Sequence, residues 1–337
     1  MVTVSRNRFM LQPYVVVGTA DVEQVESLVA LAQRAPGEGA VHRRPGLRTW
    51  HAPALGTGAT AEISTEAGLC AMAELEAALA HTGGSPDAAQ EGGPPGGSVT
   101  ALVLSNSIGT TQAMWDAQAE ALAGDFDIIR YDHRGHGSSP VPRGPYSLAD
   151  LGGDVLVLLD ERGIERTHFC GLSLGGMVGM WLAEYAPERI DRLVLCCTAT
   201  HMDAGIWAER IASARKAGRV EPLADATMER WFTPRFRAER PEVVARFRAM
   251  VARTPVEGYV ACAEAIVGMT IEHRLASITA PTLVVAGARD PSTPPEQGEA
   301  IAHAIPGARF EIVDAAHMAN VEQPDRVTAL IREHLAA

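Results

Sequence analysis

A glycine-flanked serine is the clearest sign of chemistry in this sequence. Residues 171–176 read GLSLGG, so Ser173 lies in a G-x-S-x-G pattern. The apolar run Thr167–Cys170 before it predicts a strand, and Gly175–Pro187 after it predicts a helix. A sharp strand-to-helix turn lifts a serine hydroxyl clear of the sheet, which indicates that Ser173 is a nucleophile. Without that context, Ser173 would only cap a helix in a glycine-rich connection.

A serine needs a base to attack at neutral pH, and the base needs an acid that fixes its tautomer. The apolar run Thr282–Ala286 leads into Asp290, and the run Arg309–Val313 leads into His317. Both residues would follow the carboxyl ends of strands, which is the edge where open α/β sheets bind ligands. Serine, acid, histidine is also the chain order found with strand–turn–helix nucleophiles. We expect Ser173, Asp290 and His317 to form a catalytic triad.

Two other polar groups compete for chemical roles. Asp314 lies three residues before His317 and is the alternative acid, but the loop position after the earlier strand favours Asp290. His133 and His136 are three residues apart in a glycine-rich loop, with no third metal ligand near them in sequence. We therefore predict no metal site.

The negative oxygen that forms when serine attacks a carbonyl needs backbone N–H groups aimed at it. The N–H of Leu174, at the start of the helix after the nucleophile, would be one donor. The second is expected from the loop after the predicted strand Thr100–Leu104, which reads SNSIGT over residues 105–110. Counting back from Trp115 assigns it to the N–H of Ile108.

Strands and helices alternate from residue 100 onward. Besides the elements already named, the pattern predicts strands at Phe126–Tyr131 and Arg192–Thr198 and helices at Thr110–Gly124, Leu148–Gly163, Pro295–Ala304 and Asp325–Leu335. Such alternation builds βαβ units, so the fold class is α/β, with a mostly parallel sheet flanked by helices. Between Ala199 and Ser277 amphipathic helices follow one another without a strand, which indicates a helical lid inserted late in the sheet.

The first 98 residues are organised differently. Residues 82–98 hold six glycines and three prolines with almost no bulky apolar side chain, which is typical of a linker. We predict an N-terminal segment over residues 1–81, a linker over 82–98, and an α/β domain over 99–335 with its lid at about 199–277. Within the first segment, the patterns favour helices at Val22–Gln33 and Glu66–Ala80 and strands at Leu47–Trp50 and Thr60–Ser64.

The composition excludes several classes of partner. The formal net charge of the 337 residues is −12 and no Lys/Arg block appears, which argues against nucleic acid. No apolar run approaches the ~18 residues needed to span a membrane. The apolar patch near the N-terminus resembles a signal peptide, but Gln12 and Pro13 interrupt it. The five cysteines show no C-x-x-C spacing, so we expect free thiols in a cytoplasmic protein. No feature indicates an oligomeric state.

Four segments together resemble the 3-oxoadipate enol-lactonases of the α/β-hydrolase superfamily. They are LSNSIGTTQAMWD from residue 104, YDHRGHGSS from residue 131, FCGLSLGGMVGMWLA from residue 169 and ERWFTPRF from residue 229. The run Ser-Asn-Ser-Ile-Gly-Thr is the more specific element, because most relatives carry His-Gly there. The resemblance covers about residues 100–335 and implies the α/β-hydrolase fold.

The resemblance implies hydrolysis of an anionic enol-lactone to 3-oxoadipate, a step of the β-ketoadipate pathway, without a cofactor. The substrate carboxylate needs a cation, and the predicted lid offers two pairs, Trp207 with Arg210 and Arg230 with Trp231. Arg134 is a further candidate outside the lid. Other ester or lactone hydrolysis and cofactor-free perhydrolysis remain alternatives. A non-catalytic binding protein is disfavoured because all three triad residues are present.

The N-terminus departs from this family, whose members begin with two strands directly before the one equivalent to Thr100–Leu104. Either residues 1–81 supply divergent first strands, or the hydrolase core is truncated and a foreign segment is fused to it. The run AGLCAMAELEAALA from residue 67 resembles the first helix of carboxymuconate cycloisomerases, enzymes of the same pathway.

Overall fold

The computed structural model describes residues 100–336, except the side chains of Glu272 and His273, and the backbone of five strands among the first 99 residues. The chain divides into two compact units, Met1–Gly96 and Gly97–Ala337. This boundary falls inside the glycine- and proline-rich stretch near residue 96.

The five N-terminal strands form a sheet of their own, in the order β1-β2-β5-β4-β3. They are β1 (Val2–Arg6), β2 (Pro13–Val17), β3 (Ala40–Arg44), β4 (Leu47–Ala52) and β5 (Ala59–Ile63). The strands predicted around residues 47–50 and 60–64 overlap β4 and β5. The two helices predicted in this segment lie outside the described residues. Within the described residues, β1–β5 form one sheet, and the strands of the second unit form another.

The second unit contains a six-stranded sheet in the order β11-β10-β9-β8-β6-β7, and every neighbouring pair is parallel. Its strands are β6 (Ala101–Ser105), β7 (Asp127–Arg130), β8 (Thr167–Leu172), β9 (Ile190–Cys196), β10 (Thr282–Gly287) and β11 (Arg309–Val313). All residues of β6, β8 and β10 are buried. Their continuous apolar sequences therefore suit strands that are covered on both faces.

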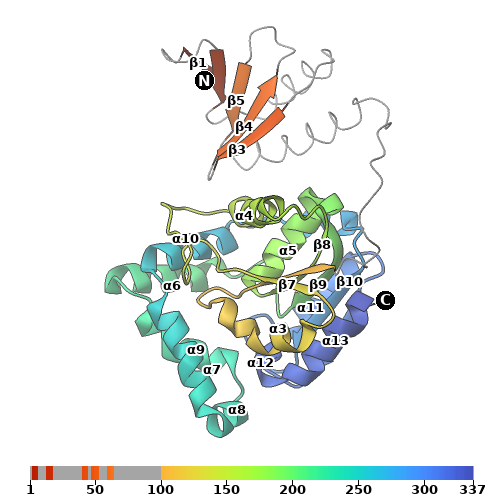
Figure 1. Ribbon diagram of the computed structural model, residues 1–337. Helices are drawn as coiled ribbons and strands as arrows, with labels where there is room; N and C mark the ends of the chain where they lie inside the picture. Colours follow the sequence, from red (N-terminus) through yellow and green to blue (C-terminus); the bar gives the residue numbers. More distant parts are fainter. Residues whose placement is uncertain are drawn as a thin grey trace. The chain divides into compact units, whose positions relative to one another are not determined.

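Helices cover both faces of this sheet. Figure 1 shows α4 (Leu148–Glu161) and α5 (Leu174–Tyr185) on one side, and α3 (Asp116–Leu122) and α13 (Pro324–Ala336) on the other. The helix α11 (Pro295–Ala304) packs on β10. With the parallel sheet, these helices make the α/β-hydrolase arrangement that the sequence predicts.

Five helices lie between β9 and β10, where the sequence predicts a lid. They are α6 (Ala204–Ala217), α7 (Ala224–Trp231), α8 (Pro234–Glu239), α9 (Pro241–Arg253) and α10 (Val256–Val267). Gly218 follows α6 with a φ of +64°, a left-handed conformation that lets the chain leave the helix. No helix in the described part of the chain has the length and apolar character needed to cross a membrane.

A buried acid on α5 gives a test of this packing. Glu184 is 7% exposed, and neither of its carboxylate oxygens has a hydrogen-bond partner among the described residues. Burial raises the pKa of Glu184 from 4.5 to about 8, against the opposing charge of Arg274. Between these two pH values the folded chain therefore holds a proton that the unfolded chain releases, so rising pH favours unfolding.

Glu184→Gln should consequently become more stable relative to wild type as the pH rises from about 4.5 to about 8, and the difference should level off above that. We expect the gap in Tm to widen by several °C, measured by thermal unfolding at a series of pH values. Glu161→Gln, at an exposed position on α4, is the matched control and should show no such gap. If the difference in Tm between Glu184→Gln and wild type stayed constant with pH, this would contradict the raised pKa of Glu184.

Candidate active site

Ser173 occupies the sharp turn between β8 and α5. Its backbone has a φ of 57° and a ψ of −115°, a conformation that residues other than glycine rarely adopt. A methyl group at Gly171 would collide with the carbonyl oxygen of Gly175, and one at Gly175 would collide with that of Ser105. The two glycines are therefore required because β8, α5 and β6 approach so closely at this turn.

The end of β9 fixes the strained turn from the neighbouring strand. The N–H of Ser173 donates to the carbonyl of Cys196 at 2.9 Å. The hydroxyl of Thr198 donates to the carbonyl of Ser173 at 2.8 Å. These two bonds hold the backbone of Ser173, so its side chain is set by the fold.

Asp290 and His317 reach the same edge of the sheet from the loops after β10 and β11. His317 Nδ1 lies 2.7 Å from Asp290 Oδ2, and the two side chains are 2% and 0% exposed. The Asp290 carboxylate also accepts from the N–H of Ser292 at 2.7 Å and from the hydroxyl of Thr293 at 2.7 Å. Because Nδ1–H of His317 donates to this carboxylate, Nε2 is left to act as an acceptor.

The competing carboxylate lies elsewhere. Asp314 forms an ion pair with Arg289, and its side chain is 67% exposed. The structure therefore pairs His317 with Asp290 and not with Asp314.

Ser173 and His317 both line a partly open cavity that residues of the lid helices also line, with about 500 Å³ of open space including the solvent at its mouth. The Trp231 ring, at the end of α7, lies over the His317 ring with 6.2 Å between the centroids. No hydrogen bond joins Ser173 Oγ to His317 in the described residues, a contact that commonly tightens only around a substrate. The cavity thus brings the candidate nucleophile and base to one wall.

The loop after β6 supplies a second wall of this cavity, with Ile108 among its lining residues. The N–H of Gly109 donates to His136, that of Thr110 to the carbonyl of Ser107, and that of Ser107 to Met114 Sδ. Among the N–H groups of residues 107–110, only that of Ile108 has no acceptor in the described residues.

The N–H of Leu174 is the first of α5, where an α-helix offers no acceptor of its own. Neither of the predicted oxyanion donors, the N–H groups of Ile108 and Leu174, therefore has an acceptor among residues 100–336.

Two arginines of the lid line the cavity as well. The Arg210 guanidinium stacks on the Trp207 ring, 4.7 Å from its centroid, and Arg230 donates to the Thr227 hydroxyl at 3.1 Å. Among the described residues neither arginine forms an ion pair with a carboxylate. Burial lowers the pKa of Arg230, and the nearby charge of Arg210 lowers it further. The cavity therefore holds two guanidinium groups that form no ion pair with a carboxylate of the described residues.

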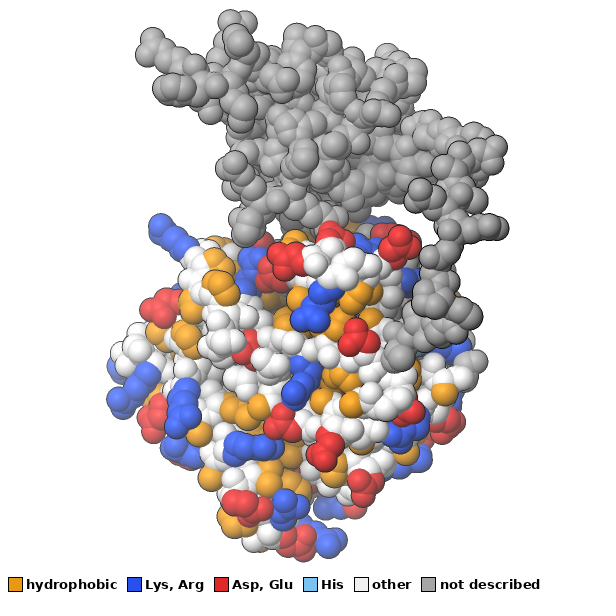
Figure 2. Space-filling model, in the orientation of Figure 1, with side chains coloured by type: hydrophobic (Ala, Val, Ile, Leu, Met, Phe, Trp, Pro, Cys, Tyr) orange, Lys and Arg blue, Asp and Glu red, His pale blue; other side chains and the backbone are white. Residues whose placement is uncertain are grey.

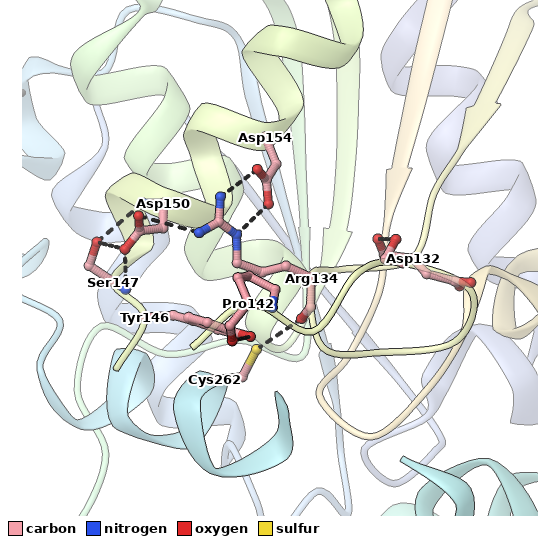
Figure 3. A network of polar contacts seen from close by, with 9 residues as sticks. Asp132, Arg134, Pro142, Tyr146, Ser147, Asp150, Asp154 and Cys262 are labelled. Atoms are coloured by element: carbon pink, nitrogen blue, oxygen red, sulfur yellow. Dashed lines mark hydrogen bonds and ion pairs between the residues drawn. The ribbon is translucent and has the colours of Figure 1, made fainter. Parts of the chain in front are cut away.

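Arg134 is not part of this cavity, contrary to the expectation from the sequence. Its guanidinium donates to both carboxylate oxygens of Asp154, at 2.7 and 2.6 Å, and lies 3.4 Å from Asp150 (Figure 3). It also lies over the Tyr146 ring at 5.4 Å. Two carboxylates on α4 thus compensate its charge, and the assignment of Arg134 as a substrate ligand is corrected.

Sequence reasoning missed three polar groups in the cavity wall. Tyr259, on α10, is buried and lines the cavity; burial raises its pKa, while the charges of Arg210 and Arg230 lower it. Ser107 Oγ and Trp207 Nε1 are buried without a protein partner in the described residues. Tyr259 follows the apolar pattern of its helix and so looks like an ordinary core residue, whereas the other two offered no signal that their polar atoms lack partners.

The remaining chemistry-bearing residues are engaged elsewhere. Cys170, Cys196, Cys197 and Cys262 are free and buried, while Cys70 lies outside the described residues. The described residues contain no group of three or more metal-ligating side chains placed to hold an ion. On the face shown in Figure 2, basic and acidic side chains are interspersed over the second unit without a continuous basic surface.

Comparison with known proteins agrees with this architecture. Residues 100–324 match the α/β-hydrolase fold family, and the chain belongs to it. Among its relatives is 3-oxoadipate enol-lactonase 2 of Acinetobacter baylyi, 40% identical over 66% of this chain and 84% of that protein. The crystal structure of the enol-lactonase from Burkholderia xenovorans LB400 is 41% identical, covers 73% of this chain and 94% of that one, and has a TM-score of 0.70. A putative carbamate hydrolase, RutD, of Azorhizobium caulinodans is 33% identical over 68% of this chain and 88% of that protein.

Proposed function

We propose that this chain hydrolyses 3-oxoadipate enol-lactone to 3-oxoadipate, with Ser173 as nucleophile, His317 as general base and Asp290 as the acid that orients it. The observation that carries the proposal is one cavity lined by Ser173, by His317, which is paired with Asp290, and by two lid arginines that form no ion pair with a carboxylate of the described residues. The similarity to proteins named enol-lactonases supports the same substrate.

In the first half-reaction, Ser173 Oγ attacks the lactone carbonyl while His317 Nε2 accepts its proton. Asp290 stabilises the resulting imidazolium, and the N–H groups of Ile108 and Leu174 donate to the oxyanion. The ring C–O bond then breaks, and His317 returns the proton to the leaving oxygen. This oxygen is an enol, which becomes a ketone and can no longer close the ring.

In the second half-reaction, water attacks the acyl-enzyme. His317 accepts a proton from the water, and the same two N–H groups stabilise the second oxyanion. Ser173 leaves with the proton from His317, and the product carries a new carboxylate. The reaction consumes one lactone and one water and needs no redox partner.

The lid arginines explain why the substrate is anionic. A carboxylate in a partly buried cavity loses its hydration, which a paired guanidinium replaces with charge-assisted hydrogen bonds. Arg210 and Arg230 line the same cavity, and within the described part of the chain neither is paired with a carboxylate that would compete for it. Trp207 and Trp231 supply flat apolar surface beside them for the lactone ring.

The proposal is tested by comparing three substrates at equal concentration: the enol-lactone, its neutral methyl ester and a small carbamate. Loss of the enol-lactone absorbance reports ring opening, and ammonia release reports carbamate hydrolysis. We expect the highest kcat/KM for the anionic lactone. A higher kcat/KM for the carbamate or for the neutral ester would contradict the proposed substrate.

Arg210→Gln and Arg230→Gln, made separately, should each lower kcat/KM for the anionic lactone about ten- to a hundredfold, because a charge-assisted hydrogen bond is worth about 1.5–3 kcal/mol. The neutral methyl ester should lose less than about threefold, since it carries no charge to pair. Steady-state rates on both substrates measure the difference.

Arg215→Gln is the control, because Arg215 lies on the lid helix α6, as Arg210 does. Its side chain is 60% exposed and pairs with Glu264, so it should affect neither substrate. Equal losses on both substrates, or no loss in either arginine variant, would show that the carboxylate is bound elsewhere.

A further inference from the structure

The loop Asp132–Ser139 contains two histidines that the proposed mechanism does not use. His133 and His136 are 1% and 0% exposed. Their spacing predicts no metal site, and the structure directs both rings at the backbone of the oxyanion loop.

The two histidines hold opposite ends of the segment Asn106–Gly109. His133 Nε2–H donates to the carbonyl of Asn106 at 3.0 Å, and His136 Nε2 accepts from the N–H of Gly109 at 2.8 Å. A carbonyl can only accept and a backbone N–H can only donate, so the two rings are required in opposite tautomers. The His136 contact also requires a neutral ring, because a protonated Nε2 could not accept, and burial lowers the pKa of each histidine to about 4.

The tautomer of His136 is fixed from its other side. His136 Nδ1–H donates to the carbonyl of Arg134 at 3.3 Å, which leaves Nε2 as the acceptor for Gly109. The same carbonyl accepts from Cys262 Sγ of the lid helix α10 at 3.7 Å (Figure 3).

The histidine loop is itself anchored on two elements. Figure 3 shows the Arg134 guanidinium bound to Asp150 and Asp154 of α4. On the lid side, a methyl group at Gly135 would collide with the backbone of Gly258 in α10. His136 therefore has little freedom to move away from Gly109.

We propose that His136 is a positioning residue that sets the oxyanion hole by holding the N–H of Gly109, and with it the free N–H of the adjacent Ile108. Gly109 has a φ of +76°, so rotation of the Ile108–Gly109 peptide is the local motion that this bond restrains. The inference rests on the proposed function, because it concerns the group that would stabilise the oxyanion. It gives the histidine loop a role in transition-state stabilisation without contact to the substrate.

The test compares His136→Leu, which removes the acceptor, with His136→Gln, whose amide oxygen can take the place of Nε2. His136→Asn is a second loss variant, because its shorter amide cannot reach Gly109. His168→Leu is the control for general destabilisation. His168 is buried near the start of β8, at the end of the strand away from Ser173. A fluorophosphonate titration counts active sites in each preparation, so rates are compared per working site.

We expect His136→Leu and His136→Asn to lower kcat about ten- to a hundredfold with KM changed less than about threefold, since removing one oxyanion donor outright costs about 10²–10³ in kcat. His136→Gln should recover most of the loss. His168→Leu should lower Tm and leave kcat per site unchanged. A boronic acid, whose serine adduct places an oxygen in the oxyanion hole, should bind His136→Leu more weakly by the same factor as the loss in kcat.

Wild-type kcat per site in both loss variants would overturn the inference, as would a His136→Gln variant as slow as His136→Leu. A wild-type protein that opens no lactone and hydrolyses no ester would instead overturn the proposed function. The two failures are therefore distinguishable in one set of measurements.

Discussion

Ser173→Ala should fold like the wild-type protein and lose lactone and ester hydrolysis by about four to six orders of magnitude. The backbone of Ser173 is held by hydrogen bonds to the Cys196 carbonyl and from the Thr198 hydroxyl, so removing the Ser173 hydroxyl leaves the fold in place. Steady-state rates and thermal unfolding measure the two effects. Ser277→Ala, at an exposed position, is the control and should match wild type in both. Activity of the Ser173 variant within tenfold of wild type would remove the basis for a serine nucleophile.

Asp290→Asn should lower kcat by about 10³–10⁴, while Asp314→Asn should change it less than about twofold. An amide at position 290 can donate to Nδ1 of His317, which moves the ring proton to Nε2 and removes the base that Ser173 needs. The carboxylate of Asp314 is exposed and paired with Arg289, away from this ring. Rates and Tm of both variants measure the ranking, and the reverse order would assign the acid to Asp314.

The sheet and its nucleophile turn could be predicted because their signals are local. Buried parallel strands leave short apolar runs, and a tight strand-to-helix turn leaves glycines on both sides of Ser173. The positions of Asp290 and His317 followed from a single rule, that residues after parallel strands meet at one edge of the sheet. Their pairing at 2.7 Å is what that rule predicts.

The error at Arg134 has a tertiary cause. A sequence shows that an arginine is present in a loop but not which carboxylate it meets. Asp150 and Asp154 are one helical turn apart on α4, so both face the loop and bind the guanidinium. The same limit applies to Arg210 and Arg230, which meet in one cavity only because α6 and α7 fold over it.

The N-terminal unit was read only in part. The sequence patterns predict strands near β4 and β5, but the runs that form β1 and β2 resemble parts of a signal peptide that Gln12 and Pro13 interrupt. A short apolar run bounded by arginine or proline fits either interpretation, and only its pairing decides. The β1–β2 pairing is antiparallel over five residue pairs, from Val2 with Val17 to Arg6 with Pro13.

The most direct test of the account is substrate-protected labelling of the nucleophile. The protein is treated with a fluorophosphonate, digested, and the labelled peptide is sequenced by mass spectrometry, with and without a saturated lactone that carries the same carboxylate arm. We predict a single label on Ser173, slowed by the lactone carboxylate but not by its methyl ester. A label on another residue, or equal protection by the charged and the neutral lactone, would contradict the claim that Ser173 lies in a cavity built for an anionic substrate.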